Sequence, residues 1–402
     1  MSYNFVVFSL SPWNINYGCN IKDISIELAR QGHRVLYIDV PLKRKERWFM
    51  KDKPFVKEVN DRHRSGQSLK QIGEGLWHYM PDEILESVNS VNSNSLFDAV
   101  NYINNKRFTK SIRKAIRAVG FDDYVLVNDN EIYNGLHLKK MLNPPVYMYY
   151  LRDMLSAFVY WKKHVSRLEP ELIGLADVVV TNSEYLSDYA GKFNGKSYYV
   201  GQGCDVTQYM QRPPQAEIEA VLKDIPRPIV GYVGALNAER LNISLIHELA
   251  LKRPELSFVL VGPEDQAFQE SPLHEVKNIY FLGKKDVADL PKYIHGFDVA
   301  INPQVLNEIT IGNYPRKVDE YLAAGVPVVA TKTHAMNPFR EHVYLGETAE
   351  EYSALITQAL QENSPAKSKS RVDFAAGHTW KNNVLEMLKA LEGLKAGSQS
   401  AV

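Results

Sequence analysis

Short apolar runs alternate with amphipathic stretches along the first 200 residues. Phe5–Ser9 is an apolar run of the kind that is buried in a parallel sheet. Ile21–Gln31 has apolar residues at helical spacing and is followed by Gly32, a typical helix stop. His33–Val40 is the next apolar run. This order predicts a βαβ unit with a right-handed crossover.

The alternation continues to about residue 200. Further strands are predicted at residues 124–128, 146–150 and 178–182, and helices at 108–119, 169–176 and 183–192. Strands that alternate with helices are typical of a doubly wound α/β domain. We therefore expect residues 1–210 to form one Rossmann-like domain.

A second series of strands follows a proline-rich segment. The predicted strands are Ile229–Val233, Ser257–Val261, Ile279–Leu282, Asp298–Asn302 and Val326–Ala330. We expect residues 211–228 to be a linker, 229–376 a second Rossmann-like domain and 377–396 a terminal amphipathic helix. Ligands of open α/β sheets bind beyond the carboxyl ends of the strands, so a cleft between two such domains is the expected site.

The composition narrows the class of protein. Lys and Arg number 47 and Asp and Glu also number 47, so no net basic charge favours nucleic acid. Cys19 and Cys204 are the only cysteines, which excludes a disulfide scaffold and a cysteine-rich zinc module. No apolar run approaches the roughly 18 to 20 residues that span a bilayer. With no secretory signal recognised, we expect a cytoplasmic location, which docking on lipid would make peripheral on the inner face of the cell membrane.

One segment, Pro41–Ser68, is unusually basic. It carries nine Lys or Arg residues against four acids, with Trp48, Phe49, Met50 and Phe55 among them. Two interpretations remain open for residues 43–64. They could form a solvated loop, or they could dock on anionic lipid, where each basic residue near the surface contributes about 1 kcal/mol.

Several catalytic motifs are absent from the sequence. There is no H-E-x-x-H, G-x-S-x-G, C-x-x-C or helix-opening G-x-G-x-x-G, which weakens protease, hydrolase, zinc-module and dehydrogenase interpretations. No D-x-D is present to hold a divalent cation, and we expect neither a metal nor a cofactor. Residues 190–197 resemble a P-loop, but a predicted helix precedes them and a strand follows, which is the reverse of the order that a P-loop needs.

The candidate chemistry lies in Asn302–Thr331. A predicted strand ends at Pro303, a polar loop follows, and a helix begins near Pro315. Lys317 and Glu320 are three residues apart on this helix and so lie on neighbouring faces. Lys317 would neutralise a diphosphate beside the helix N-terminus, whose amides also favour anions, and Glu320 would accept hydrogen bonds from a diol such as ribose.

This segment resembles the donor domain of retaining group 1 (family 4) glycosyltransferases of the GT-B fold. It is most similar to a bacterial polysaccharide branch of the teichuronic-acid and capsule type. The motifs that match are N-E-[LI]-T, at Asn307-Glu308-Ile309-Thr310, and P-x-K-x-x-E-Y-L-A-A-G, from Pro315 to Gly325. The resemblance implies an α/β fold of two Rossmann-like domains, in which residues 1–210 bind the acceptor and 229–376 the nucleotide-sugar donor. It further implies that the helix at 377–396 crosses back to the first domain. It also implies donor-binding residues Gly18, Gly234, Arg240, Asn307, Glu308, Ile309, Thr310, Lys317 and Glu320.

The sequence departs from the family pattern at three positions. Gly312 stands where the family has a glutamate that touches the donor sugar, and Glu308 would take over that task. Ala235 replaces an arginine, and Arg240 stands at the position of the family's lysine. The missing arginine leaves Arg240 and Lys317 as the two cations for the diphosphate.

The resemblance also implies a mechanism. In retaining transfer on one face, the leaving diphosphate accepts the proton of the acceptor hydroxyl, so the protein mainly positions substrates and stabilises charge. Lys317, Arg240 and helix amides would replace a metal cation, and Gly18 would let the backbone approach the diphosphate. Asp153, which follows the strand at 146–150, would bind or deprotonate the acceptor. The candidate catalytic residues are therefore Glu308, Asp153, Lys317 and Arg240.

Structural roles remain open for these residues. Glu320 could pair with Lys317, Arg240 could form a surface salt bridge, and Asp153 could pair with Arg152 or cap a helix. Glu308 could be a loop carboxylate and Gly18 a plain turn residue. The sequence thus favours transfer of a sugar from a nucleotide-sugar to a surface-polysaccharide or lipid-linked acceptor. The alternatives are a nucleotide-sugar epimerase of the same fold and a glycan-binding or nucleotide-sugar-binding protein without catalysis.

Overall fold

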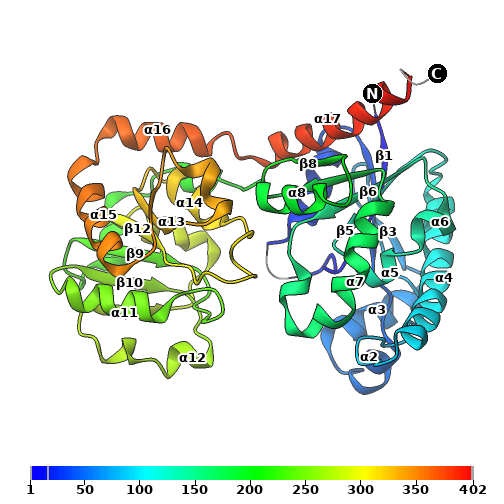
Figure 1. The fold of residues 1–402 in the computed structure, drawn as a ribbon, viewed down its shortest axis with the longest axis horizontal. Coiled ribbons are helices and arrows are strands. Elements are labelled where there is room, and N and C mark those ends of the chain that lie inside the picture. The colour runs from blue at the N-terminus through cyan, green and yellow to red at the C-terminus, as the bar shows by residue number, and fades with distance from the viewer. Residues whose placement is uncertain (1, 16–17, 400–402) are drawn as a thin grey trace. The chain divides into compact units, whose positions relative to one another are not determined.

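The computed structural model describes residues 2–15 and 18–399, which form two compact units (Figure 1). Unit 1 runs from the N-terminus to Gly201 and also includes the chain from Asn383 onward. Unit 2 is Gln202–Asn382. The second unit is therefore inserted, along the chain, between two parts of the first.

Unit 1 contains an eight-stranded sheet in the order β3-β4-β2-β1-β5-β6-β7-β8. Its strands pair in parallel, except that β3 and β4 form an antiparallel pair. The strands are β1 Asn4–Ser9, β2 Arg34–Asp39, β3 Leu69–Gly73, β4 Leu76–Tyr79, β5 Val125–Asp129, β6 Val146–Leu151, β7 Val178–Thr181 and β8 Ser197–Tyr199. Most residues of β1, β2, β5, β6 and β7 are buried, as expected for strands covered on both faces.

The helices of unit 1 follow the strands along the chain. They are α1 Asn20–Arg30, α2 Arg44–Phe49, α3 Pro54–Arg64, α4 Asn94–Val119, α5 Ile132–Gly135, α6 Leu138–Leu142, α7 Val159–Leu175 and α8 Glu184–Gly191. The longest, α4, begins where the Ser93 hydroxyl accepts the Leu96 N–H and ends at Gly120, which adopts a left-handed conformation. Part of this helix was predicted; the polar first half, Asn94–Arg107, was not.

Unit 2 contains a six-stranded sheet in the order β11-β10-β9-β12-β13-β14. The strands are β9 Ile229–Val233, β10 Ser257–Val261, β11 Ile279–Gly283, β12 Val299–Asn302, β13 Val328–Thr331 and β14 Tyr344–Gly346. All pairs are parallel. The two parallel sheets confirm the predicted α/β class of two Rossmann-like domains.

The helices of unit 2 enclose two apolar cores. They are α9 Thr207–Met210, α10 Gln215–Leu222, α11 Ile243–Lys252, α12 Gln266–Gln269, α13 Leu290–Ile294, α14 Arg316–Ala323, α15 Ala349–Glu362 and α16 Pro365–Ala375. Ile229 and Val233 belong to one core and Val230 and Tyr232 to the other, because successive strand residues face opposite sides of the sheet.

The last helix, α17 Trp380–Gln399, contains the point where unit 2 ends and unit 1 resumes. Asn383 donates hydrogen bonds to the carbonyls of Val200 and Gly201, at 3.0 and 2.8 Å. Val384 and Leu391 are fully buried. Within the described residues, no helix is long and apolar enough to cross a membrane.

Three segments can be compared directly with what the sequence predicted for them. Residues 211–228, expected as a linker, include α10, whose Ile218 and Leu222 are buried. Pro41–Ser68 contains two helices, α2 and α3, rather than a loop. The P-loop-like residues 190–197 join the end of α8 to β8, in the order that excludes a P-loop.

Candidate functional site

A pocket of about 340 Å³ lies at the carboxyl ends of β9 and β12 in unit 2. These strands are neighbours, but the chain leads from β9 to β10 and β11 on one side and from β12 to β13 and β14 on the other. Such a point, where the strand order reverses, is where open α/β sheets bind ligands. The lining residues are Tyr232, Ala235, Asn237, Arg240, Leu241, Asn302, Gln304, Asn313, Tyr314, Pro315, Arg316 and Lys317.

Lys317 brings a positive charge to this pocket from the first turn of α14. Its Nζ donates a hydrogen bond to the Tyr232 hydroxyl at 2.8 Å and lies 4.8 Å from the centre of the Tyr232 ring. Among the described residues Lys317 forms no ion pair, so its charge remains available to an anion. The positive end of the α14 dipole lies on the same side.

Arg240 is the second cation of the pocket, and its loop is anchored on both sides. The Arg240 carbonyl accepts the Val305 N–H at 2.9 Å, and the Asn242 N–H bonds to the Pro303 carbonyl at 2.9 Å. The loop after β9 is thus bonded to the loop after β12. Lys317 and Arg240 were predicted to be the two cations that bind the diphosphate, and both line this pocket.

Two buried amide groups also line the pocket. Asn302 is 1% exposed and Gln304 8%. The Asn302 Nδ2 and Gln304 Oε1 atoms have no hydrogen-bond partner among the described residues. Buried polar groups are usually satisfied, and orphans beside a pocket are suited to bond with a polar ligand.

The N-E-I-T residues build a loop beside the pocket and do not line it. The Asn307 Oδ1 accepts the N–H groups of Ile309 and Thr310 at 2.9 and 3.0 Å, and its Nδ2 donates to the Glu239 carbonyl at 2.8 Å. Thr310 is fully buried, whereas Glu308 is exposed. The roles of Asn307, Glu308, Ile309 and Thr310 toward a donor stay predictions.

Glu320 lies one turn beyond Lys317 on α14, outside the pocket lining. Burial raises the pKa of the Glu320 carboxyl group, and the nearby positive charges of Arg316 and Lys317 offset part of that rise. The donor role of Glu320 stays a prediction.

The helix that carries Lys317 is fixed by a buried carboxylate that the sequence did not single out. The Asp319 Oδ1 lies 2.6 Å from His378 Nδ1, which is also 3.2 Å from the hydroxyl of Tyr314, a lining residue. Burial raises the pKa of Asp319, whereas the bond to His378 acts against that rise. His378 therefore has a structural contact here, as its surroundings of Phe339 and Phe374 also indicate.

Gly234 follows β9 beside Lys317, at a φ of +147°. A Cβ atom on Gly234 would lie 2.9 Å from both the Lys317 Nζ and the Tyr232 hydroxyl. A Cβ atom on Gly262 would lie 1.8 Å from the Gly234 carbonyl oxygen. The two loops therefore meet backbone to backbone, which requires glycine at both positions.

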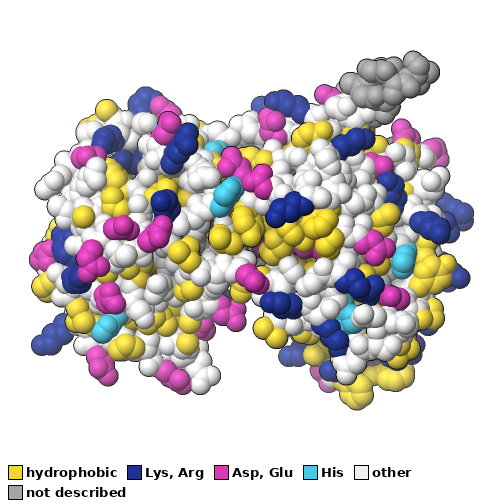
Figure 2. Space-filling model, viewed as in Figure 1, with side chains coloured by type: hydrophobic (Ala, Val, Ile, Leu, Met, Phe, Trp, Pro, Cys, Tyr) yellow, Lys and Arg dark blue, Asp and Glu magenta, His cyan; other side chains and the backbone are white. Residues whose placement is uncertain are grey.

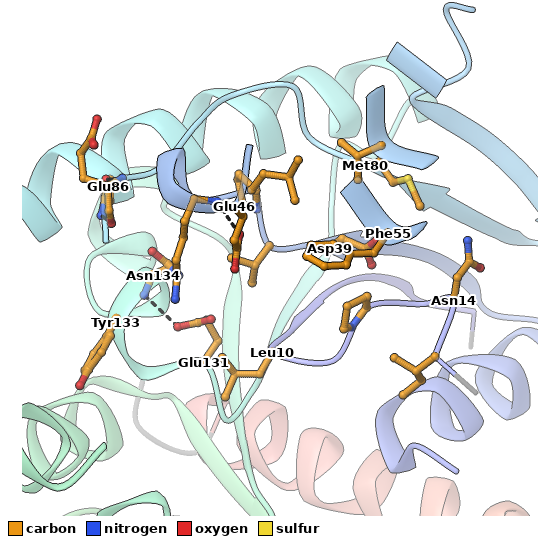
Figure 3. A pocket seen from close by; sticks show the side chains of 18 of the residues that line it. Leu10, Asn14, Asp39, Glu46, Phe55, Met80, Glu86, Glu131, Tyr133 and Asn134 are labelled. Carbon is orange, nitrogen blue, oxygen red and sulfur yellow. Dashed lines mark hydrogen bonds between the residues drawn. The ribbon is translucent and has the colours of Figure 1, made fainter. Parts of the chain in front are cut away.

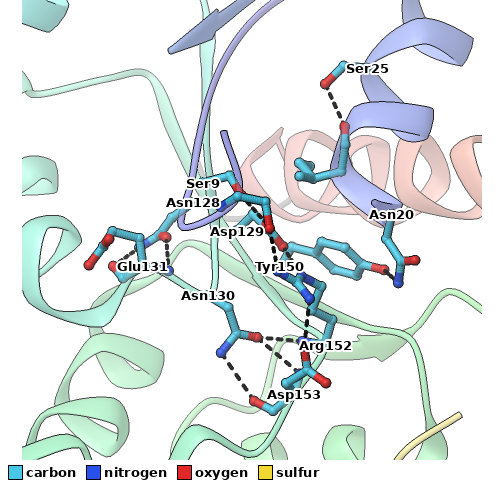
Figure 4. A network of polar contacts seen from close by, with 12 residues as sticks. Ser9, Asn20, Ser25, Asn128, Asp129, Asn130, Glu131, Tyr150, Arg152 and Asp153 are labelled. Atoms are coloured by element: carbon cyan, nitrogen blue, oxygen red, sulfur yellow. Dashed lines mark hydrogen bonds and ion pairs between the residues drawn. The ribbon is translucent and has the colours of Figure 1, made fainter. Parts of the chain in front are cut away.

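In unit 1, Asp153 belongs to a polar network at the ends of β5 and β6 (Figure 4). The Arg152 guanidinium bonds to Asp129 at 2.8 Å and to Asp153 at 2.6 Å. Asp129 is fully buried and also accepts the Ser9 hydroxyl at 2.5 Å. The ion pair with Arg152, one of the structural roles considered for Asp153, is therefore present. The role of Asp153 toward an acceptor stays a prediction.

Gly18 is exposed and lies two residues before α1. It is among the residues described, but the chain just before it, residues 16–17, lies outside them. Its proposed contact with a diphosphate stays a prediction.

Several residues of the unit 2 pocket escaped sequence analysis. Asn302 and Gln304 could have been noticed, because they stand at the carboxyl end of a predicted strand, where ligands bind. Tyr232 lies within a strand and looks like a core residue, so only the structure reveals its contact with Lys317. Among the described residues, no group of three or more His, Cys, Asp or Glu side chains could hold a metal ion.

Comparisons with known proteins agree with this geometry. Residues 227–362 match the family model described as group 1 glycosyl transferases. A relative from Bacillus subtilis (strain 168), TuaH, which is named as a glycosyltransferase of teichuronic acid biosynthesis, is 26% identical over 241 residues. That match covers 57% of this chain and 59% of TuaH, which is less than two thirds of its length.

Solved structures show the same fold over nearly the whole chain. HepE from Anabaena in complex with UDP aligns with a TM-score of 0.66 at 16% identity, over 98% of this chain and 100% of that one. Sucrose-phosphate synthase from Thermosynechococcus elongatus aligns with a TM-score of 0.68 at 15% identity, over 98% and 100%. At such identities the likeness establishes the fold. The chain therefore has the two-domain GT-B fold, and its residues 227–362 are similar to the group 1 glycosyl transferases.

Proposed function

We propose that the protein transfers a sugar, with retention, from a nucleotide-sugar donor to a cell-surface polysaccharide or lipid-linked glycan. The observation that carries the proposal is the unit 2 pocket, where Lys317 and Arg240 stand beside the N-terminus of α14. Two cations and a helix N-terminus are suited to a diphosphate. The solved structure of HepE with UDP-glucose, which shares the fold, supports a donor of this class.

In this proposal the diphosphate lies against Lys317 and Arg240, which stabilise the negative charge that grows as the sugar leaves. The unpartnered amides of Asn302 and Gln304 bond to polar groups of the donor. The bond between the anomeric carbon and the diphosphate breaks, and the acceptor oxygen takes its place on the same face. The proton of the acceptor hydroxyl passes to the diphosphate. Glu308 and Glu320 would contact the sugar and ribose, and Asp153 the acceptor.

The first test is binding of nucleotide diphosphates by calorimetry, with UDP, GDP, dTDP, CDP and ADP. We expect one of them to bind selectively, and Lys317→Ala to weaken it by about 10- to 100-fold, because a charge-assisted hydrogen bond contributes about 1.5–3 kcal/mol. Lys277→Ala is the matched control, since Lys277 is exposed and precedes the amino end of β11. Equal losses in the two variants, or no nucleotide binding at all, would refute the proposal.

The alternatives are separated by their products. A transferase consumes the donor only when a glycan acceptor is present, and joins the two. An epimerase converts the nucleotide-sugar alone into its epimer, and a binding protein leaves the donor unchanged. Mass spectrometry of donor and acceptor after incubation distinguishes these three outcomes.

We also propose that the α2–α3 face of unit 1 docks on anionic lipid. Trp48 and Phe49 are 61% and 79% exposed, and Phe55 is 42% exposed. Hydrophobic side chains gather over α2 at the lower end of unit 1, with basic side chains beside them (Figure 2). Exposed aromatic residues among lysines match the chemistry of an anionic membrane surface.

Co-sedimentation with vesicles tests this docking. We expect binding to vesicles that contain phosphatidylglycerol and much less binding to pure phosphatidylcholine. Changing Lys51, Lys53 and Lys57 to glutamate should abolish the difference. The same change at Lys106, Lys140 and Lys192, which are also exposed in unit 1, should leave it intact. Unchanged binding by the first variant would contradict the docking.

A further inference from the structure

Unit 1 has a pocket of its own, of about 540 Å³ (Figure 3). Its floor is formed where the chain leaves β1, β2 and β5, at Leu10, Val40 and Glu131. β1 and β5 are the neighbouring strands at which the strand order of this sheet reverses. The pocket therefore occupies the position in unit 1 that the donor pocket occupies in unit 2.

The charged side chains of this pocket are mainly acidic. Five carboxylates line it and Lys43 is its one cationic lining residue among those described; the five are Asp39, Glu46, Glu58, Glu86 and Glu131. Glu86 forms ion pairs with Arg44 at 2.6 Å and with Arg107 at 3.0 Å, which hold its pKa at about 2, and Asp39 lies 3.0 Å from His78 Nε2.

Glu46 and Glu58 form no ion pair among the described residues, whereas the charge of Arg62 acts on Glu58 and Asp39 and that of Lys43 on Glu131. Glu46 accepts the Lys43 backbone N–H at 2.7 Å, and Glu58 accepts the side-chain amide of Asn14. Glu131 accepts the Asn134 N–H at 3.1 Å, and Figure 3 shows Glu131 and Glu46 around the same space. The pocket thus presents hydrogen-bond acceptors together with two carboxylates, Glu46 and Glu58, that form no ion pair in the part of the chain that the structure describes.

Apolar and aromatic side chains make up the rest of the wall. Tyr133 and Trp161 are packed with ring centres 5.3 Å apart and both line the pocket. Phe55 lines it from α3 and is 42% exposed, so one wall of the pocket also belongs to the α2–α3 face. Aromatic rings with acceptors suit a sugar ring, whose hydroxyls donate and whose C–H faces pack on aromatic groups.

We infer that this pocket binds the acceptor sugar in an uncharged or amine-bearing form and discriminates against sugars that carry carboxylate or phosphate. The inference rests on the proposed transferase function, since it assigns the acceptor to unit 1. It adds a substrate class, because an anionic group would meet the carboxylates of Glu46 and Glu58 in a partly desolvated site, where like charges repel most strongly. An ammonium group would instead be attracted.

Three octyl glycosides test this, since they share the chain and ring and differ in charge. Octyl β-glucoside is neutral, octyl β-glucosaminide carries an amine, and octyl β-glucuronide carries a carboxylate. Binding is measured by calorimetry below the micelle concentration, on the full protein saturated with its nucleotide diphosphate. We expect the glucuronide to bind at least tenfold more weakly than the glucoside, and the glucosaminide to bind at least as tightly.

The double variant Glu46→Gln with Glu58→Gln keeps the hydrogen-bond acceptors and removes two charges. It should narrow the preference for the glucoside over the glucuronide by at least threefold. Glu74→Gln is the control, because Glu74 is exposed in the β3–β4 turn, beside the amino end of β2. Folding of unit 1 in each variant is checked by hydrogen exchange in β1, β2 and β5, and the nucleotide affinity of unit 2 should not change.

The outcomes separate the two proposals. If no nucleotide binds, the transferase proposal fails. If the nucleotide binds and the glucuronide binds as well as the glucoside, or none of the three glycosides binds, the assignment of this pocket is wrong. Equal effects of the double variant and of Glu74→Gln would also overturn it.

Discussion

Lys317 forms no ion pair among the described residues, and its hydrogen-bond partner, Tyr232, offers a hydroxyl and a ring instead of a carboxylate. Arg152 in unit 1 is in the opposite situation, since Asp129 and Asp153 both bond to it. A cation that is already paired gains little from a further anion, because it must give up an existing partner. The residues therefore favour anion binding in unit 2 and do not favour it at Arg152.

Glu169 on α7 is a residue whose burial has a measurable cost. Its side chain is fully buried, Tyr189 donates to it at 3.3 Å, and its Oε1 has no hydrogen-bond partner among the described residues. Burial raises its pKa from an ordinary 4.5 to about 7. The folded protein therefore keeps a proton between pH 4.5 and 7 that the unfolded chain has released.

Stability should fall as the pH rises through that window, because the folded state binds more protons than the unfolded state there. The full loss is about 3 kcal/mol above pH 7, at about 1.4 kcal/mol for each pKa unit. The side chain of Glu169→Gln cannot ionise, so this variant should not lose stability across the window. In urea unfolding of unit 1, the free energy of unfolding of Glu169→Gln minus that of the wild type should therefore grow as the pH rises. Glu171→Gln, exposed on the same helix, is the control. Parallel curves for Glu169→Gln and the wild type would show that the prediction is wrong.

At the scale of elements, the approach of the β9 and β10 loops decides where Lys317 lies. The Gly234 N–H bonds to the Val261 carbonyl at 2.9 Å, and Gly262 leaves room for the Gly234 carbonyl. A methyl group at position 262 would push the backbone at Gly234 away, and with it the wall of the unit 2 pocket.

We expect Gly262→Ala to lower the stability of unit 2 by about 1–3 kcal/mol and to weaken nucleotide binding at least tenfold. Gly283→Ala is the comparison, since a Cβ there meets nothing within 4 Å and only its φ of +66° is unfavourable. Both variants should lose stability, but only Gly262→Ala should lose nucleotide affinity. Calorimetric binding and thermal unfolding measure the two effects, and unchanged affinity in Gly262→Ala would contradict the argument.

The sequence predicts strands β9 to β13 of unit 2 because they are apolar runs, most of which end at Gly or Pro, whereas β14, α10, α15 and α16 were not predicted. Ile229–Val233 and Ser257–Val261 are found at their predicted bounds. The helices α2 and α3 and strand β3 were missed, since most of their residues are polar or exposed. Strand β4 was missed although Leu76, His78 and Tyr79 are buried, because it has only four residues. Likewise Lys317 and Arg240 follow from motif spacing, whereas the contact of Tyr232 with Lys317 arises only in the fold.

At the scale of the whole molecule, unit 1 depends on the end of the chain. Leu391 of α17 is fully buried, whereas Leu385 on the same helix is 40% exposed. We expect Leu391→Ala to destabilise unit 1 by about 2–5 kcal/mol and Leu385→Ala to have little effect. Hydrogen exchange should then accelerate in β1, β5 and β6 of the first variant and stay unchanged in the strands of unit 2. Equal protection in both variants would argue against this dependence.

This arrangement has a consequence for the growing polypeptide on the ribosome. The residues that complete unit 1 are translated only after the 181 residues of unit 2, from Gln202 to Asn382. At about 5–20 residues per second, that interval lasts roughly 10 to 40 s. For that time the apolar surface that Val384 and Leu391 later cover is open to water and to other proteins. We therefore expect the nascent chain, rather than the finished protein, to be the form most dependent on chaperones.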